Sequence, residues 1–247
     1  MSDNAFFKKY ADGYAKSISH SRGKDLNILL AALPNRSNLC LDVATGTGFT
    51  AAAISQICDR VIAIDETKAM IDKAKRLMED SGIKNVEFVK TAFEDYKPVG
   101  KFDVITIRRA LHHFKDKDKF FEISRNLLND KGILAITDMV SPEDDIYDDI
   151  NTLERIRDPT HVGALKVSEY RKMAEKHRMK IIMLKTDKED FKFEEWIYPV
   201  PMDSDASRNS LAFLKGLPPD HLKNIGFDME NLILKKNRII ITLSKDD

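Results

Sequence analysis

The sequence has few residues that could stabilise a fold by cross-links in place of a packed core. It contains two cysteines among 247 residues, and we find no internal repeat and no low-complexity segment. Two cysteines are too few for a disulfide-rich scaffold, so Cys40 and Cys58 are expected to be small, buried, apolar side chains in a reducing compartment. The hydrophobic fraction of 43% suffices for an ordinary core and argues against a disordered chain.

The chain also lacks an excess of charge of either sign. Lys+Arg and Asp+Glu both number 40, so the formal net charge is zero. A protein that coats nucleic acid usually carries a basic excess, because neutralising phosphates supplies most of its affinity. We therefore predict no nucleic-acid partner.

Long apolar runs are missing as well. No stretch is long and apolar enough to span a bilayer, and the N-terminus has no apolar signal core. These absences predict a cytoplasmic protein without a membrane span.

What the sequence does contain is an alternation of short apolar runs and amphipathic segments. Strands are expected over residues 39–44, 60–64, 86–90, 103–107 and 133–138. Helices are expected over residues 49–58, 68–80 and 118–128. Apolar strands separated by helices are typical of a parallel sheet covered on both faces. The pattern predicts a doubly wound, Rossmann-like α/β fold that binds ligands at the carboxyl ends of its strands.

The two ends of the chain differ from this core. Residues 1–33 are expected to be helical, because apolar residues recur there at helical spacing. A helix over residues 168–178 and two late strands, 180–184 and 238–243, are expected near the other end. The polar insertion between those strands suggests a lid. Its aromatic stretch, FKFEEWIY, suits either a lid or a contact between two copies in a homodimer.

We expect one domain over residues 1–247. Its parts are an N-terminal helical cap (1–36), a cofactor-binding core (37–140), a substrate-side segment (141–167) and an insertion or lid (186–236).

A glycine-rich turn follows the first strand, in LDVATGTGF. Gly46 and Gly48 allow the backbone to approach a ligand closely, and the next helix presents its positive N-terminal end. Gly46, Gly48 and Ala51 fit the dinucleotide fingerprint, and Asp65 lies near the distance expected for its ribose-binding acid. An adenosyl-sulfonium cofactor is the second ligand class that uses this geometry.

Asp42 distinguishes the two ligand classes. A carboxylate beside a pyrophosphate would repel it, whereas the ammonium and sulfonium groups of S-adenosylmethionine (SAM) are attracted. The pattern Asp42, Ala44, Gly46, Gly48 matches the acid-x-G-x-G-x-G motif of SAM-binding proteins, with Ala44 in place of the first glycine. Asp42 could instead merely satisfy N–H groups of the loop.

Residues after the second and third strands complete the predicted cofactor site. Asp65 could accept hydrogen bonds from both ribose hydroxyls, cap the following helix, or do both. Met70 could pack on adenine or belong to the core. Ala92 and Phe93 follow the third strand, where backbone amides often read adenine, although Thr91 replaces the acid that is usual there.

The fourth strand ends at Arg108, Arg109, Ala110, Leu111, His112 and His113. Imidazole titrates near neutral pH, so His112 or His113 is a candidate general base, and Arg109 could steady an anion. The same histidines could instead form hydrogen bonds at the start of a helix. A zinc site would need further ligands at suitable spacing, and we predict no metal.

Four motifs carry a family resemblance: LDVATGTGFTA, VIAIDETKAM, FDVITIRRALHHF and ILAITDMVSPED. In this order they resemble the class I SAM-dependent methyltransferases, in particular the small-molecule group akin to the ubiquinone and menaquinone biosynthesis methyltransferases. The resemblance implies a seven-stranded sheet of order 3-2-1-4-5-7-6 with the seventh strand antiparallel. It also implies that the N-terminal helices and the segment after the fifth strand fold over the site.

The resemblance assigns candidate residues. Those for the cofactor are Tyr14, His20, Asp42, Ala44, Thr45, Gly46, Gly48, Asp65, Glu66, Met70, Ala92, Phe93 and Arg108. Those for catalysis are His112, His113 and Arg109. Residues 154–161 are expected to form a turn above the strand ends, where Glu154, Arg157 and His161 could face the acceptor or form a salt-bridged loop.

The predicted reaction is methyl transfer from SAM to a small-molecule acceptor, such as a quinone-like or phenolic compound, by in-line displacement. S-Adenosylhomocysteine (SAH) is the product. A nicotinamide-dependent oxidoreductase is the alternative, but it leaves Asp42 unexplained. A cofactor-binding module that acts through partners without catalysis also remains open.

Overall fold

The computed structural model describes residues 5–98 and 100–246, so the first four residues of the predicted N-terminal helical segment lie outside the described residues. The helices are α1 (Ala5–Lys16), α2 (Ile18–Arg22), α3 (Lys24–Ala31), α4 (Phe49–Ile54), α5 (Lys68–Asp80), α6 (Lys117–Leu127), α7 (Asp149–Arg157), α8 (Val167–Lys176), α9 (Phe193–Ile197), α10 (Asp205–Gly216) and α11 (Pro219–Ile225). The strands are β1 (Ser37–Val43), β2 (Cys58–Asp65), β3 (Val86–Lys90), β4 (Phe102–Arg108), β5 (Leu128–Met139), β6 (Met179–Lys192), β7 (Phe227–Asp228) and β8 (Ile233–Lys245). Short 3-10 turns, η1 (Phe93–Asp95) and η2 (Leu111–His113), follow β3 and β4.

Within the described ranges, the strands form one eight-stranded sheet of order β3-β2-β1-β4-β5-β8-β6, and the short β7 pairs with β8. Strands β1 to β5 pair in parallel, while β8 runs antiparallel to both β5 and β6. The predicted doubly wound α/β fold and strand order are therefore confirmed, with β8 in the place of the predicted seventh strand. This topology brings the carboxyl ends of β1, β2, β4 and β5 to one edge of the sheet.

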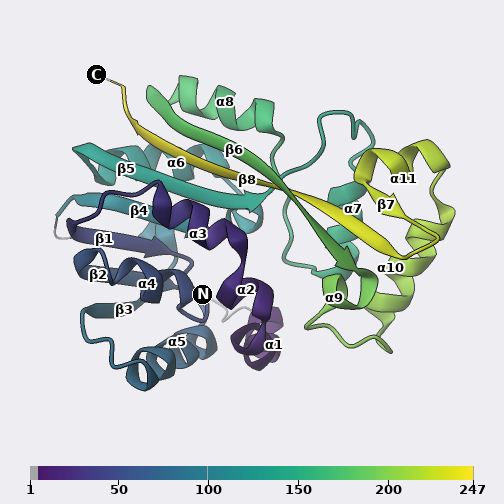
Figure 1. Ribbon diagram of the computed structural model, residues 1–247, viewed down its shortest axis with the longest axis horizontal. Coiled ribbons are helices and arrows are strands. Elements are labelled where there is room, and N and C mark those ends of the chain that lie inside the picture. Colours follow the sequence, from purple (N-terminus) through teal and green to yellow (C-terminus); the bar gives the residue numbers. More distant parts are fainter. Residues whose placement is uncertain (1–4, 99, 247) are drawn as a thin grey trace.

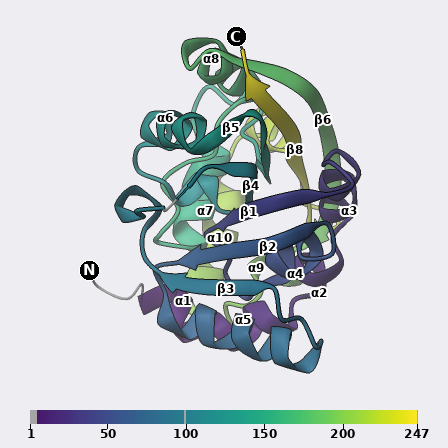
Figure 2. The same ribbon diagram turned by 90° about the vertical axis from the view of Figure 1, so that its left-hand side faces the viewer.

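Helices lie on both faces of the sheet (Figure 2), and alternation along the strands divides the main core into two layers. In β1, Cys40 belongs to the layer that contains Leu29 of α3 and Ile54 of α4. Its neighbour Leu41 belongs to the opposite layer, with Phe120 of α6 and Tyr170 of α8. Helices thus cover both faces, and ligand access is left to the ends of the strands.

Strands β6 and β8 extend beyond the ends of the other strands and connect the sheet to a small helical lobe (Figure 1). Their pairing continues from Met179 opposite Lys245 to Lys192 opposite Ile233. We call α7, α9, α10, α11 and β7 the helical lobe. It has a hydrophobic core of its own, in which Trp196 and the fully buried Leu214 take part. The lobe lies at the carboxyl edge of the sheet (Figure 1).

Three local predictions were wrong. The helix predicted over residues 49–58 ends at Ile54, and Cys58 begins β2. The turn predicted over residues 154–161 begins later, because Glu154 and Arg157 lie in the last turns of α7. The late strands predicted over residues 180–184 and 238–243 are too short, because β6 continues to Lys192 and β8 begins at Ile233. No helix among the described residues is long and apolar enough to cross a membrane.

The two cysteines form a disulfide between β1 and the start of β2. Both residues are buried, as expected. The expectation of two separate thiols is wrong, because β1 and β2 are neighbouring strands that place the two Cα atoms 6.3 Å apart.

Candidate active site

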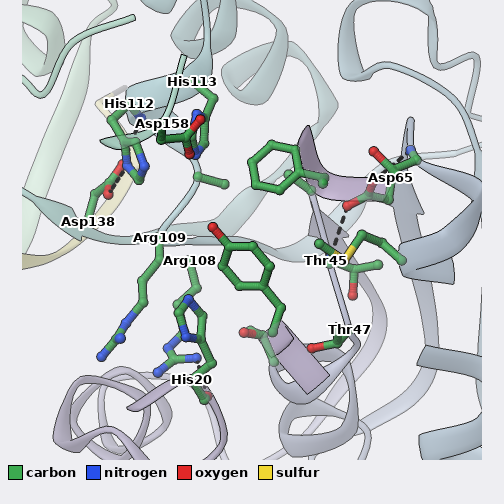
Figure 3. A pocket seen from close by; sticks show the side chains of 18 of the residues that line it. His20, Thr45, Thr47, Asp65, Arg108, Arg109, His112, His113, Asp138 and Asp158 are labelled. Carbon is green, nitrogen blue, oxygen red and sulfur yellow. Dashed lines mark hydrogen bonds and ion pairs between the residues drawn. The ribbon is translucent and has the colours of Figure 1, made fainter. Parts of the chain in front are cut away.

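A cavity of about 450 Å³ lies at the carboxyl ends of the central strands. Residues from the sheet edge, from α1 and α2, and from the helical lobe line it. All of the predicted site residues line this cavity except Gly48. Figure 3 shows Asp65 and Thr45 on one side of it and His112 with Asp138 on another.

The glycine-rich loop takes left-handed backbone conformations at three of its positions. Gly46 has φ +55°, and a Cβ built there would meet nothing within 4 Å, so its backbone is open toward the cavity. Ala44 has φ 51°, which explains why the related motif carries glycine at this position. Gly48 has φ +89°, and a Cβ there would lie 2.8 Å from the Cβ of Ala74 in α5. Gly48 therefore permits packing of the loop on α5 and does not line the ligand cavity.

Asp42 is buried beneath the loop at the end of β1. Its carboxylate accepts hydrogen bonds from the hydroxyls of Thr45, at 2.6 Å, and Thr106, at 2.7 Å. Burial raises the pKa of Asp42 to about 6. Asp42 thus supports the loop and also lines the cavity, so the structural and the cofactor-binding interpretations are compatible.

Asp65, at the end of β2, links the loop to α5. One carboxylate oxygen accepts from the N–H of Gly46 at 2.9 Å, and the other from the N–H of Thr67 at 2.8 Å. Burial raises the pKa of Asp65 to about 6. A carboxylate has further acceptor capacity beyond these two bonds, which a ribose diol could use.

Four further predicted cofactor residues follow β2 and β3 and lie close to Asp65 in the fold. Glu66 is exposed, whereas Met70 and Phe93 are buried and extend from α5 and η1. Ala92 precedes η1 and also lines the cavity. These side chains give the cavity an apolar wall with an acidic rim.

Arg108 and Arg109 share one buried carboxylate, Asp25 of α3. Asp25 accepts from Arg108 at 2.8 and 2.9 Å and from Arg109 at 2.8 and 3.1 Å. Burial alone would raise the pKa of Asp25, but the two guanidinium groups hold it well below its usual range. Arg109 has φ 54°, a left-handed conformation at the end of β4. The arrangement fixes both arginines at the cavity floor.

His112 is oriented by Asp138 at the end of β5. One oxygen of Asp138 accepts the backbone N–H of His112 at 2.8 Å, and the other lies 2.6 Å from Nδ1. Burial would raise the pKa of Asp138, but attraction to His112 and these hydrogen bonds lower it to about 2. An ionised Asp138 makes Nδ1 the donor and leaves Nε2 of a neutral imidazole as an acceptor.

His113 and His161 stand beside this pair, with ring centroids 4.0 and 5.2 Å from that of His112. His113 donates from Nδ1 to the carbonyl of Thr160 at 3.1 Å, and burial holds its pKa well below the usual range. His161 donates from Nε2 to Asn151 at 2.7 Å, and burial lowers its pKa to about 3. Both are therefore neutral imidazoles at physiological pH.

Tyr14 and His20 close the cavity from the N-terminal helices. Their rings meet edge to face, with centroids 5.3 Å apart. Nδ1 of His20 lies 2.8 Å from the hydroxyl of Ser17, and burial, followed by the charge of Arg109, holds the pKa of His20 well below its usual range. The predicted folding of the N-terminal helices over the site agrees with this placement.

Glu154 and Arg157 of α7 form a buried network with β8 and α9. Glu154 pairs with Lys236 at 2.6 Å and with Arg157 at 3.5 Å, and it accepts from the indole N–H of Trp196 at 3.0 Å. The guanidinium of Arg157 lies 5.6 Å from the ring centroid of Trp196. The predicted salt bridge thus exists, and both of its residues also line the cavity.

Comparison with known proteins decides the family. A sequence profile described as "Methyltransferase domain" matches residues 36–194. The uncharacterized methyltransferase YcgJ of Bacillus subtilis is 30% identical over 228 residues, covering 91% of this chain and 84% of the relative. Its crystal structure superposes with a TM-score of 0.81 and covers 90% of this chain and 98% of YcgJ. The chain belongs to the methyltransferase domain family.

Two further similarities refine this assignment. The crystal structure of a predicted methyltransferase from Bacillus halodurans C-125 is 28% identical, with a TM-score of 0.81 and coverage of 91% of this chain and all of that chain. A ubiquinone biosynthesis O-methyltransferase of Actinobacillus pleuropneumoniae is 31% identical over 100 residues, 38% of this chain and 42% of the relative. The predicted family and its class I fold are confirmed, and SAM is the methyl donor of this class.

Sequence reasoning missed several side chains of the methyltransferase site. Asp138 could have been found, because it is an acid at the carboxyl end of a parallel strand, as Asp42 and Asp65 are. Asp25 gave no such signal, since it lies 83 residues before Arg108 and meets it only in the fold. Lys236 lies in a stretch whose sequence predicts a polar insertion, so it gave no signal of a site either.

Among the residues that the structure describes, no group of three or more His, Cys, Asp and Glu side chains could hold a metal ion. That statement includes the neighbouring His112, His113 and His161.

Proposed function

We propose that this methyltransferase transfers a methyl group from SAM to a proton-bearing small-molecule acceptor, with His112 as the general base. The observation that carries the proposal is the His112–Asp138 pair. It lines the same cavity as the glycine-rich loop but stands at the ends of different strands. A donor side and a proton-accepting side thus share one cavity.

The residues of the donor side suit SAM chemically. Asp65 offers acceptors for the ribose hydroxyls, Gly46 offers an open backbone, and Asp42 offers a carboxylate for a cationic group. Met70 and Phe93 offer an apolar surface for adenine. When bound, SAM supplies a methyl group on a positively charged sulfur, which is already a good leaving group. A dinucleotide fits less well, because Asp42 would face its phosphates.

His112 has the arrangement of a positioned base. Asp138 holds the imidazole through both its backbone and its Nδ1, so Nε2 is free to take a proton from a phenol-like or enol-like hydroxyl. His113 has one nitrogen occupied by Thr160 and no carboxylate partner, and it packs at the edge of the Phe7 ring. We therefore assign the base to His112 and a packing role to His113. Arg109, held by Asp25, would steady the resulting oxyanion.

The first experiment tests the cofactor. Purified protein is titrated by calorimetry with SAH and, separately, with NADH. Micromolar binding of SAH without NADH binding is expected. Binding of NADH alone would overturn the methyltransferase proposal, and binding of neither ligand would favour a module without catalysis.

The second experiment tests the base. An acceptor is identified by screening catechols and phenols for conversion of SAM to SAH. His112→Gln and Asp138→Asn are expected to lower kcat by about 10²–10⁴-fold, with unchanged SAH affinity. His113→Gln is the matched control, and an equal loss there would show that the base is assigned to the wrong histidine.

A further inference from the structure

We propose that the acceptor carries a fixed anionic group, a carboxylate or a phosphate, and that Arg157, Lys236 and Arg238 bind it. We call these three residues the basic cluster. The inference rests on the proposed function, because it assumes that the rest of the cavity holds the methyl donor.

The position of the basic cluster separates it from the donor side. Arg157 comes from α7 in the helical lobe, whereas Lys236 and Arg238 come from β8, the strand that bridges to this lobe. The acidic residues at the other end of the cavity follow β1, β2 and β3; they are Asp42, Asp65, Glu66 and Glu94. The carboxylates on the side where a cationic donor is expected are therefore separated from the basic cluster beside the lobe.

The two carboxylates in direct contact with the basic cluster are each shared between two cations. Glu154 pairs with both Lys236 and Arg157. Glu189 of β6 accepts from Arg238 at 2.8 Å and lies 3.5 Å from Arg109.

Arg109 also shares its second carboxylate, Asp25, with Arg108. Asp158, whose carboxylate accepts from the N–H and the hydroxyl of Thr160, and Glu195 of α9, which accepts from the N–H of Lys192, also line the cavity. Among the described residues, the three cations of the basic cluster therefore have two carboxylates in direct contact, Glu154 and Glu189, and a buried cation that shares its counter-charge favours an anionic ligand.

Unused donors accompany this charge. Arg238 is 5% exposed. Of the nitrogens in its side chain, only Nη2 makes a hydrogen bond among the described residues, to Glu189. Nε of Arg157 is buried and has no partner there either. Arginine presents several fixed N–H donors, and both carboxylate and phosphate match that geometry.

The cluster is also held in place before any ligand binds. The Nη2 of Arg157 donates to the carbonyl of Tyr198 at 2.8 Å, and its guanidinium lies over Trp196. Lys236 is fixed by its 2.6 Å contact with Glu154. Side chains that need little reorganisation retain more of their interaction energy for the ligand.

Calorimetry on protein saturated with SAH tests the inference without turnover. The probes are 3,4-dihydroxybenzoate, its neutral amide 3,4-dihydroxybenzamide, and phenyl phosphate. At least one of the anions should bind tenfold or more tightly than the amide. Preference for benzoate or for phenyl phosphate then identifies the anionic group.

Two variants test whether the basic cluster causes the preference for the anion over the amide. Arg238→Gln and Arg157→Gln should each remove it while SAH affinity stays within twofold, and Arg238→Lys should retain part of it. Arg208→Gln, in an exposed ion pair of the same lobe, is the matched control and should change nothing.

The unfavourable outcomes are distinct. Equal binding of the amide and the anions, or no binding of either anion at millimolar concentration, overturns the inference. A tenfold loss of SAH affinity in Arg238→Gln would also overturn it, because the cluster would then hold the carboxylate of the donor. Failure of the unaltered protein to bind SAH would instead overturn the proposed function.

Discussion

At the scale of single residues, the site is built from carboxylates whose surroundings give them different protonation states. Asp25 and Asp138 stay ionised because cations or imidazole N–H groups face them. Asp42 is buried and Asp65 is half-buried, neither has a cationic partner in direct contact among the described residues, and desolvation raises the pKa of both. A cationic ligand would restore their negative charge, which links proton release to cofactor binding.

This link predicts a pH dependence. Burial raises the pKa of Asp42 and of Asp65 to about 6, whereas an unfolded aspartate titrates near ~3.9. The two carboxyls therefore stabilise the ligand-free fold most below pH ~3.9, where both are protonated. This contribution to the free energy of unfolding is lost as the pH rises to about 6. SAH affinity should increase between pH 5 and pH 7 and then level off. Calorimetry at four pH values checks this, and Asp65→Asn should flatten the profile; a flat profile in the unaltered protein would contradict it.

The ion pairs of Asp25 with Arg108 and Arg109 lead to a second prediction for single residues. Asp25→Asn leaves the buried guanidinium groups of Arg108 and Arg109 without their shared charge, and should destabilise the protein by about 3–5 kcal/mol. Asp205→Asn removes an exposed partner of Arg208 and should change stability by less than about 0.5 kcal/mol. Urea denaturation followed by circular dichroism compares the two. Similar midpoints would show that the buried network contributes little.

At the scale of helices and strands, the sequence predicts the elements that carry a recognisable apolar pattern within their own residues. The strands β1 to β5 are recognisable because each is an apolar run beside a turn or a charge. The outer halves of β6 and β8 are not, since their polar side chains show no strand pattern and pairing with each other stabilises them. The end of α7 was misjudged because Pro159 restricts only the residue before it, so the helix continues to Arg157. Contacts such as Cys40 with Cys58 depend on register, which local patterns do not give.

Packing of α5 on the glycine-rich loop predicts a contrast between two glycines. Gly48→Ala combines a left-handed backbone with a contact against Ala74 and should destabilise the protein by about 2–4 kcal/mol. Gly82→Ala has φ +66° but open space around it, so only about 1 kcal/mol is expected. Thermal unfolding measures both. SAH affinity should fall in the first variant alone, because α5 carries Met70 to the cavity; equal effects would contradict the packing argument.

At the scale of the whole molecule, the protein consists of a sheet with two layers of core and a helical lobe with a third, separate core. The cavity lies where these parts meet. Residues of the sheet edge line the side proposed for the donor, while Arg157 comes from the lobe and Lys236 and Arg238 from its bridging strand. Damage to the lobe should therefore impair acceptor binding more than donor binding.

Leu214→Ala tests this division of labour. Leu214 of α10 is fully buried in the lobe core, and its truncation should destabilise the protein by about 2–5 kcal/mol. Because the lobe core also holds α7, the affinity for the preferred anionic probe should fall at least fivefold, while SAH affinity stays within twofold. Leu128→Ala is the matched control, since Leu128 is equally buried but lies in the sheet core at the start of β5. Its loss should lower stability similarly and leave both affinities unchanged. If Leu214→Ala weakens SAH and the anion equally, the two sides of the cavity are not held by separate parts of the molecule.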